Sequence, residues 1–312
     1  MKKRQHTKRS KAWTVCSFLL SCTIFYLGLV LLFFGSGFGN SYLMQQNADD
    51  ATKTLTKEAV YTNQRHKTTY DAKKTKAINT ANLLKARQTN AYAIGKIAIP
   101  AVNIHNPLFA GYGDQNQNLA YGVVTCLPDR IMGGANNYVL AGHYMGSAGP
   151  AVLDNLHLAK PKDLIYVTNL KWIYIYQIKT ISFAVKPTQV EVENNINKQR
   201  LITLITCSDF NISKYGYGQH RTVVQGKMIG KIKATDKNLI ATELMEKPKK
   251  VKAYKEIVVP VKKKKIVIKQ VKARVKPKFY QKMSNINWLI IGFNIVFVIF
   301  VVWQLVRIVK EK

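Results

Sequence analysis

The sequence predicts a mainly β domain, an antiparallel barrel or sandwich, lying between two membrane-spanning helices. Short runs of β-branched and aromatic residues recur through residues 92–230, and Gly, Asn, Pro and Lys separate them. Such dense strand signals, with one short helix-like stretch at residues 151–158, are typical of all-β folds. Uncharged apolar segments at residues 13–34 and 286–306 predict the two spans.

The composition of the 312-residue chain excludes several classes of protein. Lys and Arg number 48 against 16 Asp and Glu, a formal net charge of +32, and 47% of the residues are hydrophobic. That hydrophobic share is too high for a wholly disordered basic protein. Four Cys residues in a chain of this length exclude a disulfide-dense scaffold, and the small number of acidic residues disfavours a metal cage built from several carboxylates.

The first apolar segment predicts an uncleaved signal anchor over residues 13–35. The uncharged residues 13–34 reach about 33 Å as a helix, enough for a hydrocarbon core of about 30 Å. The alternative is a cleaved signal peptide, which has an apolar stretch of about 7–15 residues and a small-residue cleavage site. No A-x-A site follows this segment, and the basic residues 1–12 before it place the N-terminus in the cytoplasm.

The second apolar segment, residues 286–306, has Trp288 and Trp303 at positions suited to interface anchors. The basic residues 307–312 that follow predict a cytoplasmic C-terminus by the same rule. Because both termini are cytoplasmic, everything between the two spans is expected outside the cell.

Two polar segments connect the spans to the β domain. Residues 36–91 are rich in Thr, Lys, Asn and Ala, and they predict a helical or loose stalk that holds the domain off the membrane. Residues 231–285 form a Lys-rich tail, since residues 227–282 contain 19 Lys and Arg against four acidic residues.

The Lys-rich tail has two interpretations. It is either a solvated tether that returns the chain to the membrane, or a surface that binds anionic lipid headgroups or teichoic-type wall polymers. In the second case each Lys near the surface contributes about 1 kcal/mol, less at high salt. Residues 266–276 alternate apolar with basic side chains, so a surface strand or a membrane-lying segment is a further alternative. Nucleic acid, which such a charge first suggests, is not expected as a partner outside the cell.

The strands of the β region are expected in a regular succession. The first, residues 94–99, alternates in polarity and stops at Pro100, which cannot donate to a strand ladder. The further expected strands are residues 137–141, 164–168, 172–183, 201–206 and 222–229.

Three strand ends carry residues that could perform chemistry. The apolar run 201–206 ends in Cys207, a suitable place for a nucleophile. Another strand leads into His143, and Arg221 begins a third. Taken singly, a lone Cys is more often a small buried hydrophobe and a lone His is more often structural. The informative observation is that all three occur together.

The order of these three residues resembles the sortase family of cysteine transpeptidases, and class A in particular. The TLxTC signature of the family is similar to Thr203-Leu204-Ile205-Thr206-Cys207, and its catalytic His and Arg fall on His143 and Arg221. The resemblance covers residues 92–230, which are the expected catalytic domain. It implies a sortase-type β-barrel of about eight strands with short helices, in which the three side chains converge at one end.

The resemblance also implies an activity, that of a thiol protease turned to acyl transfer. Cys207 would attack an LPxTG-type sorting signal of an exported protein between Thr and Gly and form a thioacyl intermediate. An amine of a lipid-linked peptidoglycan precursor would resolve it and anchor the protein to the cell wall. His143 would be the proton donor and acceptor and, when protonated, the cation beside the thiol, while Arg221 would stabilise the oxyanion or hold the substrate. The implied location is the cell membrane of a Gram-positive-type bacterium.

No cofactor and no metal site is expected. Some sortases bind calcium through acidic loops, but the corresponding loops here offer only Asp129, Glu191 and Glu193. Cys126 matches no functional position of the family and is expected to be structural.

The second span and the Lys-rich tail depart from class A sortases, which usually have a single N-terminal anchor. A C-terminal anchor is more typical of pilus-polymerising sortases, yet their lid motif, Asp-Pro-Trp or similar, is missing from residues 40–92. The alternatives are therefore a pilin-polymerising or hydrolytic sortase, or a non-catalytic binder of anionic wall polymers with a degenerate sortase domain. The intact set of Cys207, His143 and Arg221 argues against degeneracy.

Overall fold

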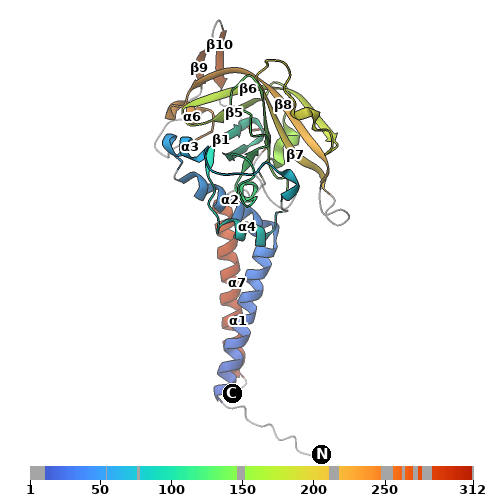
Figure 1. Ribbon diagram of the computed structural model, residues 1–312. Helices are drawn as coiled ribbons and strands as arrows, with labels where there is room; N and C mark the ends of the chain where they lie inside the picture. Colours follow the sequence, from blue (N-terminus) through green and yellow to red (C-terminus); the bar gives the residue numbers. More distant parts are fainter. Residues whose placement is uncertain are drawn as a thin grey trace, which may run out of the picture.

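A closed β-barrel forms the body of the molecule in the computed structural model (Figure 1). Around the barrel the strands follow the order β1-β2-β3-β4-β7-β8-β6-β5. They are β1 (Ala93–Ile99), β2 (Ile104–Phe109), β3 (Val123–Thr125), β4 (Asn137–Ala141), β5 (Leu164–Thr168), β6 (Trp172–Val185), β7 (Leu201–Phe210) and β8 (Gly218–Lys233). The structure describes residues 11–53, 55–75, 78–145, 152–210, 218–246, 256–261, 264–269, 273–275 and 283–310.

The predicted mainly β fold is confirmed, and every strand expected from the sequence is present. β2 and β3 lie outside the predicted set because β2 contains His105, Asn106 and Pro107, and β3 is only three residues long. The barrel is antiparallel, as expected, except at two places, since β2 pairs with β3 and β4 pairs with β7 in parallel. The helix expected near residues 151–158 is a single 3-10 segment, η5 (Asp154–Leu158), and residue 151 lies outside the described residues.

Apolar side chains fill the barrel interior, and consecutive residues of strands such as β1 and β5 are buried, so these strands are covered on both faces. The largest fully buried side chains are those of Tyr138 in β4 and Tyr176 in β6. A buried phenol needs a hydrogen-bond partner, and the Tyr176 hydroxyl accepts the backbone N–H of Gly133 at 3.1 Å.

Residues 36–91, expected as a stalk, instead pack against the barrel where the structure describes them. They form α2 (Gly37–Lys53), α3 (Lys57–Asn63), the 3-10 segment η1 (Ala72–Lys74) and α4 (Thr80–Ala86). Leu43 and Met44 of α2 and Leu83 of α4 are buried within the main hydrophobic core. The Asn47 side chain of α2 donates hydrogen bonds to the carbonyls of Leu83 and Ala120, which ties α2 to α4 and to the segment η3 (Asn118–Ala120).

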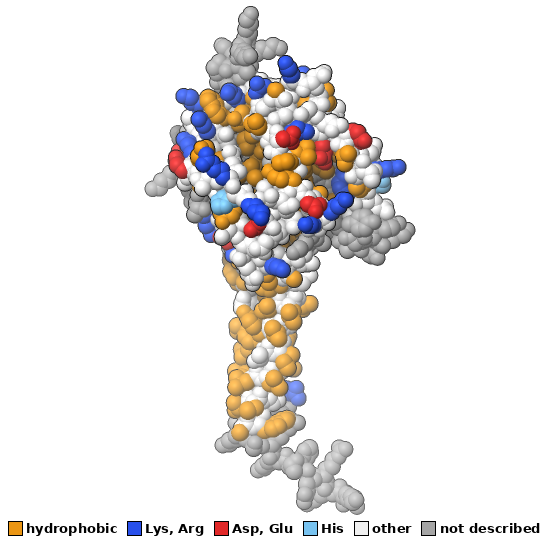
Figure 2. Space-filling model, viewed as in Figure 1, with side chains coloured by type: hydrophobic (Ala, Val, Ile, Leu, Met, Phe, Trp, Pro, Cys, Tyr) orange, Lys and Arg blue, Asp and Glu red, His pale blue; other side chains and the backbone are white. Residues whose placement is uncertain are grey.

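Two long apolar helices lie side by side below the barrel (Figure 1). They are α1 (Lys11–Gly35) and α7 (Met283–Lys310), and each contains a segment of 24 residues long and apolar enough to cross a membrane, Ala12–Gly35 and Asn287–Lys310. The Phe25 and Phe300 rings stack with centroids 4.0 Å apart. Figure 2 shows hydrophobic side chains covering this helical pair, whereas Lys and Arg side chains gather on the barrel.

The described parts of the Lys-rich tail contact the barrel. Helix α6 (Asp236–Ala241) packs Leu239 against the outer faces of β5 and β6, and β9 (Glu256–Val261) pairs with β10 (Lys264–Lys269) in a separate hairpin. Further on, Arg274 forms an ion pair with Asp163, and its backbone N–H donates to the Ala101 carbonyl at 2.9 Å. The tail is therefore fastened to the barrel at Arg274. Residues 270–272 and 276 of the alternating stretch lie outside the described residues.

Candidate active site

Parallel pairing of β4 with β7 brings two chemically important strand ends to the same level. Ala141 lies opposite Ile205, and the N–H of Gly142 continues the ladder by donating to the Ile205 carbonyl at 3.2 Å. His143 and Cys207 each follow this pair by two residues, so both emerge at the same end of the barrel.

Two small features hold these strand ends together. The buried Thr206 hydroxyl donates to the Gly142 carbonyl at 2.8 Å, which closes the β4–β7 pair directly beside Cys207. A Cβ atom at Gly142 would lie 2.8 Å from a side-chain atom of Leu153, closer than carbon atoms approach, so only glycine fits before His143.

Antiparallel pairing of β7 with β8 places Arg221 directly opposite Cys207. Nη1 of Arg221 donates to the carbonyls of Gly218 and His220 at 2.8 and 3.0 Å, which holds the guanidinium at the strand end. A Cβ atom at Gly218 would lie 2.8 Å from Cβ of Cys207, so glycine is also required there for the close approach of β8. Three neighbouring strands, β4, β7 and β8, thus carry His143, Cys207 and Arg221 with the thiol in the middle.

One cleft of about 240 Å³ is lined by all three of these residues. His220, one residue before Arg221, does not line it. The other walls come from the β6–β7 connection, including Val190, Val192 and Glu193, and from Tyr112 and Leu119. This volume can take a few side chains of an extended peptide rather than a folded domain.

Burial shifts the pKa values of Cys207 and His143. It raises the pKa of the Cys207 thiol, and the Arg221 charge and a hydrogen bond from the Gly218 N–H oppose that rise. Burial also lowers the pKa of the His143 imidazole to about 4. At neutral pH the resting cleft therefore holds a neutral thiol and a neutral imidazole. The charge that opposes the effect of burial on the thiol is that of Arg221.

The β6–β7 wall of the cleft is fastened to β4 by one buried side chain. Asn137 donates from Nδ2 to the carbonyls of Val192 and Asn194 at 3.0 and 3.2 Å, and its Oδ1 accepts the Thr203 hydroxyl at 2.7 Å. This wall includes η6 (Val190–Glu193), so the cleft is bordered by a segment with fixed backbone.

Two cleft residues come from the expected stalk, where the sequence shows no functional signal. Ala72 and Thr75, at the ends of η1, line the cleft together with Cys207. Backbone hydrogen bonds from Tyr112 to Thr69 at 2.8 Å and from Thr69 to Gly113 at 3.1 Å hold the segment before η1 in place. Only the folded chain brings residues this distant in sequence to the cleft, so no local pattern could have identified them.

Cys126, the other cysteine of the cleft, is unsuited to nucleophilic chemistry. It is buried, and this burial raises the pKa of its thiol to about 12, with a smaller contribution from Glu193. Its hydrogen bond with Tyr112 is the interaction that opposes the rise. The structural role predicted for Cys126 agrees with this environment.

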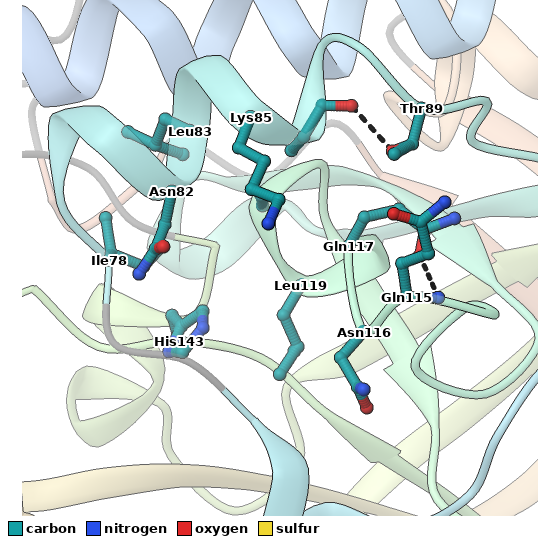
Figure 3. Close-up of a pocket in the computed structure, with 12 residues that line it drawn as sticks. Ile78, Asn82, Leu83, Lys85, Thr89, Gln115, Asn116, Gln117, Leu119 and His143 are labelled. Carbon is teal, nitrogen blue, oxygen red and sulfur yellow. Dashed lines mark hydrogen bonds between the residues drawn. The ribbon is translucent and has the colours of Figure 1, made fainter.

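A second, smaller hollow of about 40 Å³ adjoins the cleft (Figure 3). His143 and Leu119 line both, so the imidazole stands between the two spaces. Its remaining walls are α4, the segment 115–120, Ile78 and Thr89, which contribute both polar and apolar side chains. The sequence gives no signal for this hollow.

Among the described residues, no group of three or more His, Cys, Asp or Glu side chains could hold a metal ion. Asp129, one of the acids considered for calcium, pairs with Arg130 at 2.6 Å. The absence of a cofactor and of calcium remains a prediction.

The chain is similar in sequence to known sortases. The sortase domain family matches residues 97–229. Sortase A of Streptococcus agalactiae serotype III (strain NEM316) is 35% identical over 196 residues, which cover 61% of this chain and 78% of that protein. Sortase A of Bacillus anthracis is 29% identical over 213 residues, covering 68% of this chain and 94% of that protein.

Solved structures of sortases are also similar. Sortase A of Listeria monocytogenes superposes with a TM-score of 0.42 at 28% identity, covering 49% of this chain and 99% of that one. Sortase C of Streptococcus pneumoniae superposes with a TM-score of 0.44 at 21% identity, covering 62% of this chain and 98% of that one. The sequence relationship to sortase A, which extends over most of that protein, is the stronger finding, and by it the chain belongs to the sortase family of cysteine transpeptidases.

Proposed function

We propose that this sortase is anchored in the cell membrane, cleaves an LPxTG-type sorting signal between Thr and Gly, and transfers the protein to an amine of a lipid-linked cell-wall precursor. The observation that carries the proposal is the convergence of Cys207, His143 and Arg221 in one cleft, with Arg221 opposite Cys207 in the β7–β8 register. The 35% identity to a sortase A over 78% of its length supports class A chemistry.

In the first half of the reaction, His143 takes the thiol proton as Sγ of Cys207 attacks the Thr carbonyl carbon. Charge develops on the carbonyl oxygen, where the guanidinium of Arg221 can stabilise it. The imidazolium then gives its proton to the Gly nitrogen, the C–N bond breaks, and the Gly segment leaves. A neutral thiol and a neutral imidazole are the required starting forms, and burial favours both.

In the second half, an amine attacks the thioester carbon. The C–N bond forms, the C–S bond breaks, and the proton that leaves the amine passes through His143 to the sulfur of Cys207. The enzyme returns to its resting state, and the net reaction exchanges one amide for another. Water in place of the amine would give hydrolysis, the alternative activity.

Replacing Arg221 with Lys is expected to lower kcat about 10²–10³-fold with a smaller change in KM for the peptide. Lys keeps the charge but loses the planar fork of donors that is held by the Gly218 and His220 carbonyls. Steady-state kinetics on an LPxTG peptide would measure the effect, with Arg200→Lys, outside the cleft, as the matched control. Equal activity of Arg221→Lys and the wild type would contradict an oxyanion role.

The pH profile of kcat/KM is expected to be a broad plateau. Activity should fall below about pH 4, where His143 becomes protonated and can no longer accept the thiol proton. Activity should fall again at alkaline pH, where Cys207 loses its proton and the leaving group no longer receives it. Because burial raises the pKa of Cys207, this alkaline limb should lie above the ordinary thiol value of 9.0. Initial rates measured across this range would test the profile, and a low-pH limb near the ordinary histidine value would argue against a desolvated imidazole.

Two further parts of the proposal concern location and partners. Helices α1 and α7 would both span the membrane with the barrel on the extracellular face, in the order that the flanking positive charges favour. The partners would be LPxTG-bearing exported proteins and the amine-bearing precursor, with anionic lipids or wall polymers at the Lys-rich tail. A pilin-polymerising activity would differ in using a lysine side chain as the amine.

The test is an assay of the full-length chain in detergent with an LPxTG peptide, with and without an amine. A thioacyl adduct on Cys207 and an amine-exchanged product would support transpeptidation. Cleavage with no exchange would support the hydrolytic sortase. Failure to form any adduct with this peptide would overturn the proposed specificity.

A further inference from the structure

We propose that Asp154 is a positioning residue for His143, and that it acts by fixing the backbone of the loop that follows β4. This role rests on the proposed function and deepens it, because it names the side chain that sets where the imidazole stands. Asp154 is not among the described residues that line the cleft. Its effect on the chemistry would therefore pass through His143.

His143 lies in a loop and not in a strand. β4 ends at Ala141, and residues 142–145 belong to no helix or strand. Within the described part of the chain, no group forms a hydrogen bond with the imidazole. A functional histidine is usually oriented by a hydrogen bond to its second ring nitrogen. Because the described residues provide none here, the position of the ring depends on the backbone of this loop.

Two hydrogen bonds fix the loop to the chain around η5. The Met145 N–H donates to Oδ1 of Asp154 at 2.6 Å, and the Leu153 N–H donates to the His143 carbonyl at 3.2 Å. The Met145 side chain packs against the main hydrophobic core, so this residue is held at both its side chain and its N–H. The backbone that carries the imidazole is thereby tied to Asp154.

The burial of Asp154 indicates that its carboxyl group has a specific partner. Only 6% of the residue is exposed. A buried carboxyl group is strongly disfavoured unless it forms hydrogen bonds, and the Met145 N–H supplies one. An apolar side chain at this position would leave that N–H without its acceptor.

The segment that carries Asp154 is itself held firmly to the barrel. Leu153 and Leu156, on either side of it, are fully buried in the main hydrophobic core. Nδ2 of Asn155 donates to the carbonyl of Val102 at 3.0 Å. Asp154 therefore projects from a fixed base, which a side chain needs if it is to position a loop.

Replacing Asp154 with Ala in the full-length chain in detergent is expected to lower kcat on an LPxTG peptide about 10–100-fold. A misplacement of about 1 Å costs up to about 100-fold, and KM for the peptide should stay within about twofold because the imidazole does not bind it in the ground state. Asp154→Asn keeps Oδ1 as an acceptor and should retain kcat within about threefold of the wild type.

The matched control is Asp163→Ala. The Asp163 side chain is 10% exposed, and it accepts the backbone N–H of Lys160 at 2.7 Å and pairs with Arg274. This carboxylate thus resembles Asp154 in burial and in accepting a backbone N–H, but it is not among the described residues that line the cleft. The kcat of Asp163→Ala is expected within about twofold of the wild type.

Two further readouts separate positioning from a general loss of structure. In the His143→Gln background, Asp154→Ala should cost at most about twofold more, since a residue that acts through His143 then has nothing to position. Alkylation of Cys207 by iodoacetamide, followed by mass spectrometry, should keep its rate in Asp154→Ala. The thiol belongs to β7, which Asp154 does not hold.

Hydrogen exchange tests the loop without any substrate. The Met145 amide is expected to exchange about tenfold faster in Asp154→Ala than in the wild type, because it loses its acceptor. Asp154→Asn should restore the slow exchange, and Asp163→Ala should leave it unchanged.

Three outcomes would overturn the inference. The first is a kcat of Asp154→Ala within twofold of the wild type. The second is an equal loss in the His143→Gln background or in Cys207 alkylation, which would show a structural role. The third is unchanged exchange at Met145. An inactive wild type would instead overturn the proposed specificity for LPxTG peptides, and the exchange rates would still decide whether Asp154 holds the loop.

Discussion

Replacing Cys207 with Ala is expected to abolish thioacyl formation and amine exchange on an LPxTG peptide. The substitution removes one sulfur atom from the end of β7 and leaves the Thr206 hydrogen bond to Gly142 in place, so the strand end should keep its position. No other described side chain at the centre of the cleft can replace the thiol, because burial keeps the Cys126 thiol protonated with a pKa of about 12. Intact-protein mass spectrometry after incubation with the peptide would detect the adduct in the wild type and its loss in the variant.

A matched cysteine control separates loss of the nucleophile from a general effect of removing a thiol. Cys16→Ala changes an exposed cysteine on α1, far along the chain from the barrel, and is expected to leave the adduct unchanged. Thermal unfolding of Cys207→Ala should stay close to that of the wild type, because one small half-buried side chain is lost. An adduct of normal yield in Cys207→Ala would contradict the assignment of the nucleophile.

Replacing His143 with Gln is expected to lower kcat/KM about 10²–10⁴-fold, the range that general acid–base catalysis supplies. Gln fills a similar space and hydrogen-bonds, but it cannot carry a proton from Cys207 to the Gly nitrogen. Because burial lowers the pKa of His143 to about 4, the low-pH limb of the rate profile should disappear together with the activity. Steady-state rates of the two proteins at several pH values would measure both effects.

The control for this substitution is His220→Gln, one residue before Arg221 on β8 and outside the cleft lining. Its kcat/KM is expected within about threefold of the wild type, as for most substitutions away from the site. Added imidazole that restores part of the His143→Gln activity would further support a proton-transfer role. If His143→Gln retained wild-type rates of thioacyl formation, another group would have to move the proton.

Local sequence determined the elements whose physical requirements are themselves local. A spanning helix needs only length and the absence of charge, which residues 13–34 and 286–306 meet without reference to the rest of the chain. A buried strand such as β7 reads as a continuous apolar run, and β-branched residues favour it. The residues of the proposed site were also predictable, because the Thr203-Leu204-Ile205-Thr206-Cys207 motif with His143 and Arg221 resembles a known family.

The tertiary structure decided the elements that depend on contacts across long stretches of chain. β2 contains Pro107 and lacks a strand-like pattern, and it forms because β1 pairs along its length. Residues 36–91, expected as a stalk, are part of the domain because Leu43 and Leu83 are buried against the barrel core. The composition of the segment does not reveal the stabilisation that this burial provides.

The sequence by itself determined which residues are present for the chemistry, and the tertiary structure decided how they meet. Parallel pairing of β4 with β7 joins Gly142 to Thr206 across a sequence separation of 64 residues and thereby aligns His143 with Cys207. Packing of distant segments also brings Ala72 and Thr75 to the cleft, buries His143 so that its pKa is low, and encloses the hollow that Asn116 lines. Register, burial and enclosed space are properties of packed surfaces, and these surfaces exist only once distant segments have come together.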